Sequence, residues 1–434
     1  MSGPLSLPRG RAKKSNPLGP PRGRATPETP LHILSIATLF PDATRPNFGI
    51  FVERSLSALA SQPGIILTVC APVGLPPWPL SLHPRYAALH ALPLTEQWHG
   101  LTVIRPRFTL IPRLAKRNAA AIARAVMPHA AMLGAQGKLD VLDAQFFWPD
   151  GAAAHLVAKA LDLPFSIKAR GSDVSYWARH RDVGATIMAA AAAATGILSV
   201  AQTLRDDMAN LGMDAAKIRV HYTGLDAALF RPPADASDRR DARVKWGVPD
   251  DAPLIITVGA LIERKGQGLV IEAMRALPPD THYLMAGAGP DEARLGKMAQ
   301  DLGMSSRVRQ LGAVPNAQLP SLYGAADVMA LLSTSEGLAN VWVEAMACGV
   351  PLLLSDIPPA HEVLDGGDAG VVCPSEPLAI AKALRVLIAN PPDRSALSAR
   401  THARFDWNRN GAELADHLRD LVARYSGDGS GGGT

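Results

Sequence analysis

Residues 327–354 fit one arrangement of the backbone, in which a strand is followed by a loop, a helix and a second strand. The apolar run 328–332 predicts a buried strand, and Glu336 follows in the loop after it. Gly349 and Pro351 end the helical pattern that comes next, just before a second apolar run. Such a unit connects parallel strands, whose ligands bind at the carboxyl ends of the strands. We therefore expect Glu336 to lie in a ligand site.

The helix after this loop is predicted to begin near Asn340. Its first N–H groups and its positive dipole end should point into the same crevice, which is a favourable place for a phosphate. Glu344 lies on this helix, eight residues after Glu336. The stretch therefore combines two carboxylates with an anion-binding helix end.

Apolar runs alternate with helical patterns along two series of the chain. The first series predicts strands at Leu31–Ala37, Ile65–Cys70, Leu101–Pro106, Val141–Gln145, Phe165–Ala169, Ile197–Val200 and Ile218–Tyr222. The second predicts strands at Leu254–Val258, His282–Ala286, Val308–Leu311, Val328–Leu332, Leu352–Leu354 and Gly370–Val372. Between them, residues 223–253 are predicted to be an interdomain linker region. This alternation predicts an α/β protein with two mostly parallel sheets facing each other across a cleft.

The spacing E-G-x6-E-A-x3-G-x-P over Glu336–Pro351 resembles the signature of retaining glycosyltransferases of family four. The resemblance implies the GT-B fold, in which two Rossmann-like domains face each other across a cleft. It implies an acceptor domain at 31–225, a nucleotide-sugar donor domain at 226–405, and a helix at 406–425 that crosses back to the first domain. Residues 426–434 are nearly all Gly and Ser, and a flexible end is expected there.

The loop 258–266 follows another predicted strand and resembles the phosphate-binding loop of this family. Lys265 matches the lysine that contacts the leaving diphosphate in this family. Stabilisation of the charge that develops on a leaving group is usually the largest single contribution to catalysis, so Lys265 is a predicted catalytic residue. Family members often have arginine directly after the glycine that corresponds to Gly259, whereas this chain has Ala260. We expect Arg264 to supply the missing charge.

The same resemblance assigns roles to both glutamates. Glu336 would accept hydrogen bonds from the transferred sugar and is the second predicted catalytic residue. Glu344 would bind the ribose hydroxyls of the nucleotide, as carboxylates do in dinucleotide sites.

The remaining donor contacts are expected from the backbone. The N–H groups of Leu338, Ala339 and Asn340 would bind the phosphates at the helix start. Gly289 belongs to a Gly-x-Gly-Pro turn that resembles the second glycine loop of the family, at the nucleotide.

The first half should bind the acceptor. Gly49 lies in a segment resembling the glycine loop that opens the first domain of these enzymes and approaches the donor phosphates. Arg170 and Asp173 follow a strand on the cleft side, and Arg170 replaces the histidine of many family members. The R-G-S-D version resembles transferases of bacterial exopolysaccharide assembly. Arg170 and Asp173 fit either ligand contact or a structural ion pair that caps the next helix.

The sequence contains no Asp-x-Asp triplet, which provides the metal–diphosphate chelate in the other large glycosyltransferase fold. We expect catalysis without an obligatory metal and no cofactor besides the nucleotide sugar. The resemblance suggests a UDP-sugar as donor and a glycan or lipid-linked acceptor, in exopolysaccharide or glycoconjugate biosynthesis.

Residues 1–30 contain six lysines and arginines against Glu28 alone, a net charge that equals the +5 of the whole chain. The remainder is close to neutral, so a nucleic-acid partner is not expected. This tail is predicted to be disordered, with weak contact to an acidic membrane surface as one option and passive solvation as the other. It lacks the apolar core of a signal peptide.

The three cysteines suggest reduced thiols, and the apolar window 185–200 is too short to span a bilayer. A cytoplasmic protein, at most peripheral to the inner membrane face, is expected.

Three other functions are compared with this one. A dehydrogenase needs G-x-G-x-x-G after a strand, and the run 287–292 is GAGPDE, without the third glycine. A nucleotide-sugar epimerase with the same fold remains as an enzymatic alternative. A non-catalytic membrane-docking protein is disfavoured by the glutamate pair together with Lys265.

Overall fold

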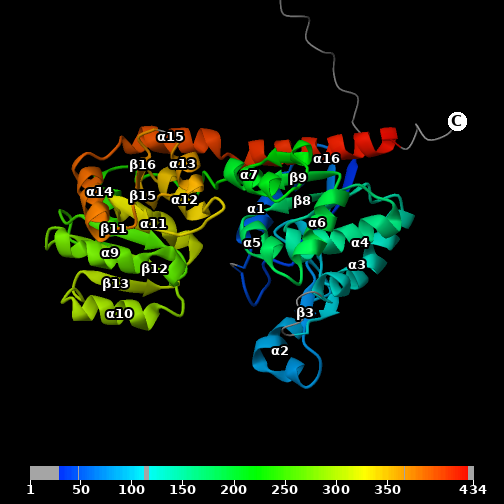
Figure 1. The fold of residues 1–434 in the computed structure, drawn as a ribbon, viewed down its shortest axis with the longest axis horizontal. Coiled ribbons are helices and arrows are strands. Elements are labelled where there is room, and N and C mark those ends of the chain that lie inside the picture. Colours follow the sequence, from blue (N-terminus) through cyan, green and yellow to red (C-terminus); the bar gives the residue numbers. More distant parts are fainter. Residues whose placement is uncertain (1–28, 47, 112–116, 366, 429–434) are drawn as a thin grey trace, which may run out of the picture.

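The structure is a computed structural model and describes residues 29–46, 48–111, 117–365 and 367–428. The chain forms two α/β domains side by side, and the final helices run along one end of both domains (Figure 1). The predictions for residues 1–28 of the basic tail lie outside the described residues, as does Asn47 in the loop before Gly49.

The N-terminal domain is built on an eight-stranded sheet of order β10-β9-β8-β7-β1-β2-β5-β4. Its pairs are parallel except β4 with β5. The strands are β1 (Leu31–Ile36), β2 (Ile65–Cys70), β4 (Thr95–Trp98), β5 (Leu101–Ile104), β7 (Val141–Ala144), β8 (Phe165–Ala169), β9 (Gly196–Ser199) and β10 (Ile218–Val220), and β3 (Val73–Leu75) pairs with β6 (Arg107–Thr109) outside this sheet. The main helices are α1 (Ile50–Ala60), α3 (Asn118–Ala135), α4 (Ala152–Leu161), α5 (Ser172–Ser175), α6 (Gly184–Ala193) and α7 (Gln202–Asn210).

The C-terminal domain has a six-stranded parallel sheet of order β13-β12-β11-β14-β15-β16. The strands are β11 (Leu254–Val258), β12 (His282–Ala286), β13 (Val308–Gly312), β14 (Val328–Leu331), β15 (Leu352–Ser355) and β16 (Gly370–Cys373). The helices are α8 (Ala236–Lys245), α9 (Gln267–Ala273), α10 (Glu292–Asp301), α11 (Leu319–Ala325), α12 (Asn340–Ala347), α13 (Pro358–Leu364), α14 (Pro377–Ala389) and α15 (Arg394–Arg404).

Successive residues of each strand point to opposite faces of the sheet, so each sheet contributes to two hydrophobic cores, one on each face. In β1, Leu34 and Ile36 pack with α3 and α4, whereas Leu31 and Ile33 pack with α1 and the last helix. Strands buried on both faces appear in a sequence as continuous apolar runs. This is why the predicted strands of both series are confirmed to within one or two residues at each end.

The segment 223–253 is not merely a linker, which corrects the prediction. It contains α8, which packs against α11 of the C-terminal domain. Arg239 and Arg243, one helical turn apart, both contact the carboxylate of Asp327, at 2.6 and 2.8 Å. A strongly charged helix thus docks through partly buried ion pairs instead of an apolar stripe, so the apolar pattern did not reveal it.

The last helix, α16 (Trp407–Asp428), crosses from the C-terminal domain and packs against α1 (Figure 1). It continues three residues into the predicted flexible end at 426–434, so that boundary was wrong. Tyr425 holds the last turns by donating its hydroxyl proton to Asp162 at 2.7 Å. Residues 429–434 lie outside the described part of the chain.

The apolar window 185–200 forms most of α6 and all of β9, which confirms a helix leading into a buried strand, although the helix buries only one face. Among the described residues, none of the helices combines the length and apolar character that crossing a bilayer requires.

Candidate functional site

Glu336 and Lys265 lie together at the carboxyl ends of neighbouring strands. Lys265 ends the short turn Glu263–Lys265 after β11, and Glu336 lies in the loop after β14, which pairs with β11. The Lys265 ammonium donates a hydrogen bond to Glu336 Oε1 at 2.5 Å. Both side chains are nearly buried, so water screens this pair weakly.

Arg264 completes this cluster. Its guanidinium lies 3.5 Å from the same Glu336 oxygen and also donates to the carbonyl oxygen of Ser335. The side chain is about half exposed, in contrast to that of Lys265. Two cations therefore converge on one carboxylate, and the predicted group of Lys265, Arg264 and Glu336 is assembled in space.

Gly259 and Gly289 belong to two loops whose backbones pack against each other. Gly259 has φ of +152°, and a Cβ atom on Gly289 would lie only 2.2 Å from the carbonyl oxygen of Leu261. A side chain at Gly289 would therefore force these loops apart. Their positions after β11 and β12 place both glycines at the same sheet edge as Lys265.

A cavity of about 460 Å³ lies between the two domains. Its N-terminal-domain lining comes from Arg170, Gly171, Ser172, Ser175 and Tyr176, and its C-terminal-domain lining from Arg264, Ser335, Glu336 and Gly337. The domains approach closely here, because a Cβ on Gly337 would lie 2.8 Å from the Arg170 carbonyl oxygen. The cavity joins the predicted catalytic glutamate to the predicted acceptor loop.

Arg170 is fixed in place by contacts on three sides. Its guanidinium donates to the backbone and side-chain oxygens of Gln145 and lies over the rings of Phe51 and Phe146, 5.0 and 5.5 Å from their centroids. Burial lowers the pKa of Arg170 to about 10, and the carboxylates of Asp143 and Asp173 oppose that shift. The arginine therefore stays charged at neutral pH, held by Gln145 in the wall of the cavity.

Asp173 has a different role from the expected ion pair. Its buried carboxylate accepts backbone N–H groups from Phe147, Arg170 and Gly171. The ion-pair hypothesis for Arg170 and Asp173 is wrong, since the Arg170 side chain donates to Gln145 instead. Asp173 shapes the loop that holds Arg170, and it is not among the residues lining the cavity.

Glu344 lies on α12, one turn after the helix start. Tyr323 donates its hydroxyl proton to Glu344 Oε2 at 3.2 Å. Burial raises the pKa of Glu344 to about 7, and the bond from Tyr323 opposes the shift. The residue that precedes the helix, Ala339, has no side chain that could accept a hydrogen bond. The first N–H groups of the helix, which begins at Asn340, therefore have no side-chain cap. Leu338, just before, is buried.

A small space beside Glu344 also involves the N-terminal domain. It is lined by Asn340, Val343 and Glu344 of α12 together with Ile50, Phe51 and Arg54 of α1 and residues of the interdomain connection. The starts of α1 and α12 therefore lie close together. Gly49, which precedes α1 with φ of +73°, lies against Leu39 and lines neither this space nor the larger cavity.

Several of these residues were not singled out in the sequence. Arg54 bridges the domains, donating to Asn316 Oδ1 at 3.0 Å and lying 3.6 Å from Asp226. The feature of the sequence that could have identified Arg54 is its position, one turn after the start of a helix that was predicted to bind an anion. Ser172, Ser175 and Tyr176 follow Arg170 directly, and a scan of the residues after that strand would have found them.

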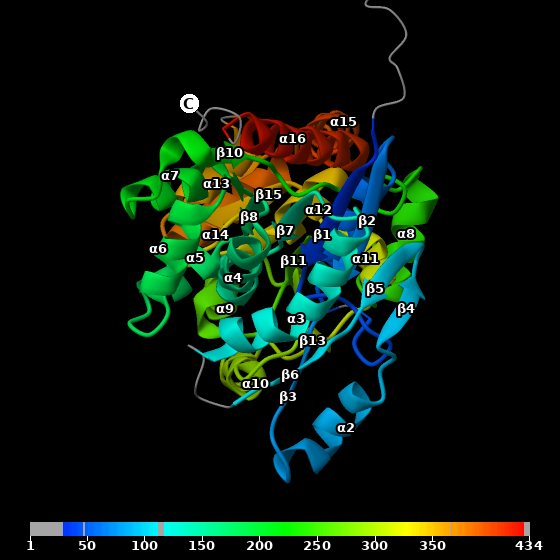
Figure 2. The same ribbon diagram turned by 90° about the vertical axis from the view of Figure 1, so that its right-hand side faces the viewer.

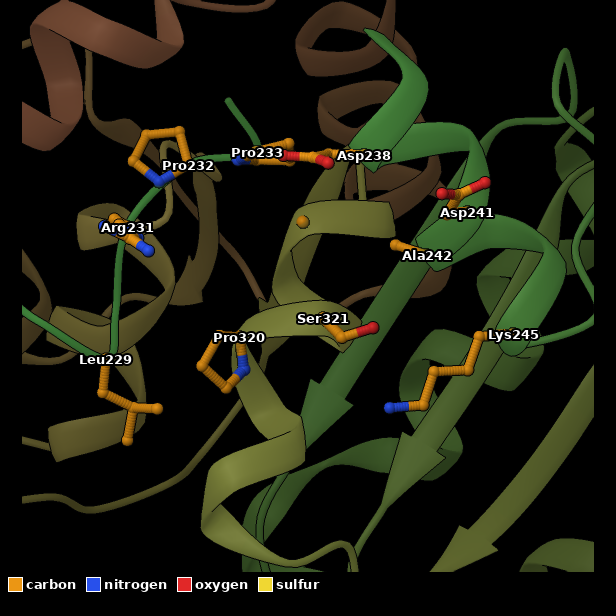
Figure 3. Close-up of a pocket in the computed structure, with 11 residues that line it drawn as sticks. Leu229, Arg231, Pro232, Pro233, Asp238, Asp241, Ala242, Lys245, Pro320 and Ser321 are labelled. Atoms are coloured by element: carbon orange, nitrogen blue, oxygen red, sulfur yellow. The ribbon is translucent and has the colours of Figure 1, made fainter. Parts of the chain in front are cut away.

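A separate cavity of about 340 Å³ lies on the C-terminal domain, between α8, α11 and the segment after β10 (Figure 3). Its lining includes Arg231, Asp238, Asp241 and Lys245, and none of the predicted site residues. Within the described ranges, no group of three or more metal-binding side chains could hold an ion.

Residues 238–404 match the family model described as glycosyl transferases group 1. TuaC of Bacillus subtilis strain 168, a glycosyltransferase named for teichuronic acid biosynthesis, is 26% identical over 412 residues, covering 91% of this chain and 100% of that protein. A D-inositol 3-phosphate glycosyltransferase of Xylanimonas cellulosilytica is 30% identical over 309 residues, 67% of this chain and 74% of the relative.

Among solved structures, Anabaena Alr3699/HepE in complex with UDP superimposes with a TM-score of 0.70 at 19% identity, covering 90% of this chain and 100% of that one. This likeness confirms the predicted fold class, the α/β GT-B fold with two domains of parallel sheet. Taken with the family model and the D-inositol 3-phosphate glycosyltransferase, these findings place the chain in the group 1 glycosyltransferases.

Proposed function

We propose that this glycosyltransferase is a retaining enzyme of family four that moves a hexose from UDP to a hydroxyl group of a glycan or lipid-linked acceptor. The observation that carries the proposal is the cluster of Lys265, Arg264 and Glu336, of which Arg264 and Glu336 line the cavity between the domains. A departing diphosphate needs positive charge, and a sugar ring needs acceptors for its hydroxyls. This cluster offers the positive charge of Lys265 and Arg264 and the acceptor oxygens of Glu336 side by side.

The donor would lie across the cleft from the large cavity to the start of α12. The sugar would occupy the cavity beside Glu336, the diphosphate would contact Lys265, Arg264 and the N–H groups of residues 338–340, and the ribose would reach Glu344. Gly259 and Gly289 would leave room for the nucleotide because neither has a side chain.

The acceptor would enter from the N-terminal domain. Arg170, held by Gln145, faces the cavity opposite Glu336 and would orient the attacking hydroxyl. Gly49 and Asp173 would support the loops of that domain. Attack would come from the face that the diphosphate leaves, so that a diphosphate oxygen takes the proton and the anomeric configuration is retained. No metal is required in this scheme, because Lys265 and Arg264 neutralise the leaving group.

The setting we infer is exopolysaccharide or glycoconjugate biosynthesis on the cytoplasmic side of a membrane. Support comes from TuaC, which is named for a teichuronic acid pathway, and from the UDP complex of the solved relative. With the proposed domain limits, 31–225 and 226–405 with the crossing helix after them, the donor residues would lie in the second unit.

A thermal-shift screen with UDP, GDP and ADP tests the donor. UDP is expected to raise the melting temperature in the presence of EDTA, and the other two nucleotides less. NMR of the anomeric proton in the product then reports retention or inversion. A shift with none of the three nucleotides would reject the proposal, and conversion of the donor sugar without any acceptor would favour the epimerase.

Glu344→Gln should raise the KM for the donor more than it lowers kcat. Ribose contacts are alike in the ground state and the transition state, so their loss weakens binding without slowing chemistry. Steady-state kinetics with varied donor concentration measures both parameters.

The pH dependence of UDP affinity provides the control for this variant. A carboxylate accepts stronger hydrogen bonds than its protonated form, so wild-type affinity should rise with pH through the pKa of Glu344, about 7. Glu344→Gln should lack this rise. An equal loss in kcat and kcat/KM at unchanged KM would instead place Glu344 at the reacting centre.

A further inference from the structure

Residues 76–94 leave the N-terminal domain as a protrusion between β3 and β4 (Figures 1 and 2). This protrusion contains a short 3-10 turn, Leu80–Leu82, and helix α2, Pro84–His90. The main contacts of α2 with other elements are to that turn and to β3. The protrusion therefore packs mostly on itself and on the strand before it.

Large apolar side chains are exposed along the protrusion. Trp78 is 78% exposed, Leu82 69%, Leu94 64% and Leu80 55%. A single exposed leucine is ordinary on a protein surface, but several on one projecting segment mark an interaction surface. Their burial in a partner would be favourable, since each leaves most of its apolar area in water.

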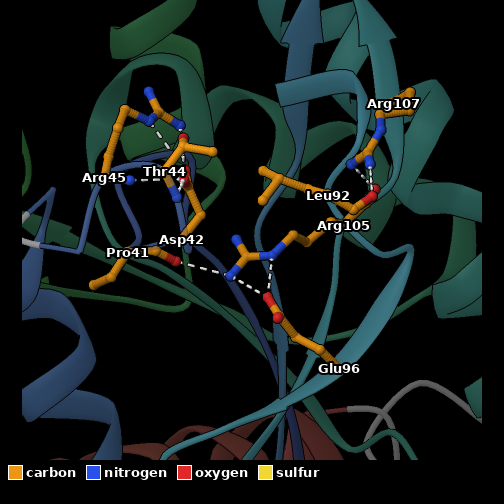
Figure 4. A network of polar contacts seen from close by, with 8 residues as sticks. All are labelled: Pro41, Asp42, Thr44, Arg45, Leu92, Glu96, Arg105 and Arg107. Carbon is orange, nitrogen blue, oxygen red and sulfur yellow. Dashed lines mark hydrogen bonds and ion pairs between the residues drawn. The ribbon is translucent and has the colours of Figure 1, made fainter. Parts of the chain in front are cut away.

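Two arginines tie the returning side of the protrusion to the domain (Figure 4). Arg105, almost fully buried, donates to Glu96 at 2.5 Å and to the carbonyl oxygen of Pro41 at 2.8 Å. Arg107 donates to the carbonyl oxygens of Leu92 and Arg105. The bond to Glu96 holds β4, and the bond to Leu92 holds the end of the protrusion.

The absence of acidic residues from the protrusion favours an anionic partner surface. Residues 76–94 contain one arginine and two histidines but no aspartate or glutamate, and the next carboxylate, Glu96, is already paired with Arg105. Tryptophan and leucine side chains on a segment without acidic residues suit the interface of an anionic bilayer, where tryptophan is enriched and a carboxylate would be repelled.

The position of the protrusion also suits a membrane. It follows β2 at the carboxyl end of the parallel strands, the edge from which Arg170 and the large cavity open. Strand β1 starts at Leu31 at the opposite end of the domain (Figure 2). Docking through the protrusion would therefore turn the acceptor edge of the cleft, rather than the chain terminus, toward the lipid.

We propose that the protrusion docks the protein on an anionic membrane surface, with Trp78, Leu80 and Leu82 entering the headgroup region. The delivery of a lipid-linked acceptor to the cleft rests on the proposed function, whereas the docking itself does not. The basic tail is not needed for it.

Co-sedimentation with phosphatidylglycerol–phosphatidylcholine vesicles tests the docking. The variant Trp78→Ser/Leu80→Ser/Leu82→Ser should lower the fraction bound to these vesicles by about tenfold or more, because three apolar contacts are lost. The matched control is Val244→Ser/Leu378→Ser/Val386→Ser, which changes three side chains of the C-terminal domain that are 78%, 77% and 50% exposed. The control should bind vesicles like the wild type. A chain lacking residues 1–30 should also retain most of its binding.

Unchanged vesicle binding by the protrusion variant overturns the proposal, as does a wild type that binds no vesicles. Loss of binding on removal of residues 1–30 alone would assign the contact to the tail. Sedimentation velocity separates a further outcome, since a wild-type dimer that the variant loses would make the partner a second copy of the chain. The UDP-induced melting shift of the variant should match the wild type. Absence of that shift in both would reject the proposed donor and leave the docking result standing.

Discussion

Lys265→Ala is expected to lower the rate of sugar transfer by roughly 10²–10³-fold, or about 3–4 kcal/mol of transition-state stabilisation. The ammonium group is nearly buried and lies at the carboxyl end of β11, where the leaving diphosphate is proposed to bind. Charge that develops on the leaving oxygen would go unmatched without it. Measurement of kcat and KM with saturating acceptor reports the loss.

The fold should survive this substitution, because Arg264 remains 3.5 Å from Glu336 and keeps that carboxylate paired. Lys297→Ala provides the control, since Lys297 is an exposed lysine on α10 paired with Asp301 at 2.9 Å. It should turn over like the wild type. Near-normal turnover by Lys265→Ala would refute the phosphate-loop assignment.

Much of the fold was predictable because its strands are buried on both faces. The predicted limits Leu254–Val258 and His282–Ala286 are those of β11 and β12. In contrast, β4 was missed, because it is an antiparallel edge strand whose residues alternate between half-buried and exposed. Helix α8 was missed for a different reason: Arg239 and Arg243 find their partner, Asp327, more than 80 residues away, and no local pattern encodes that contact.

The candidate site was predictable where strand ends define it. Glu336 and Lys265 are 71 residues apart, yet both follow parallel strands and therefore meet at one sheet edge. The surroundings of Arg170 were not predictable in this way. Gln145, Phe51 and Phe146 hold it through side-chain contacts from other elements, and those contacts depend on packing that only the folded chain provides.

Glu336→Gln should separate the two predicted catalytic residues. It should lower sugar transfer by about 10²-fold, because the glutamine holds the sugar hydroxyls in a poorer orientation. Its effect on UDP should be opposite to that of Lys265→Ala. In the wild type, Glu336 neutralises Lys265 and Arg264, and the amide releases both cations for the diphosphate.

UDP affinity, measured by titration calorimetry, is therefore expected to stay the same or increase in Glu336→Gln and to fall in Lys265→Ala. Glu263→Gln is the matched control, since Glu263 begins the turn that ends at Lys265 and its side chain is exposed. It should leave both UDP affinity and turnover unchanged. A parallel loss of UDP affinity and transfer in Glu336→Gln would show that this carboxylate acts by holding the phosphate loop in shape. Glu336 would then be a positioning residue for Lys265, and the contact to the transferred sugar would have to come from another side chain of the cavity.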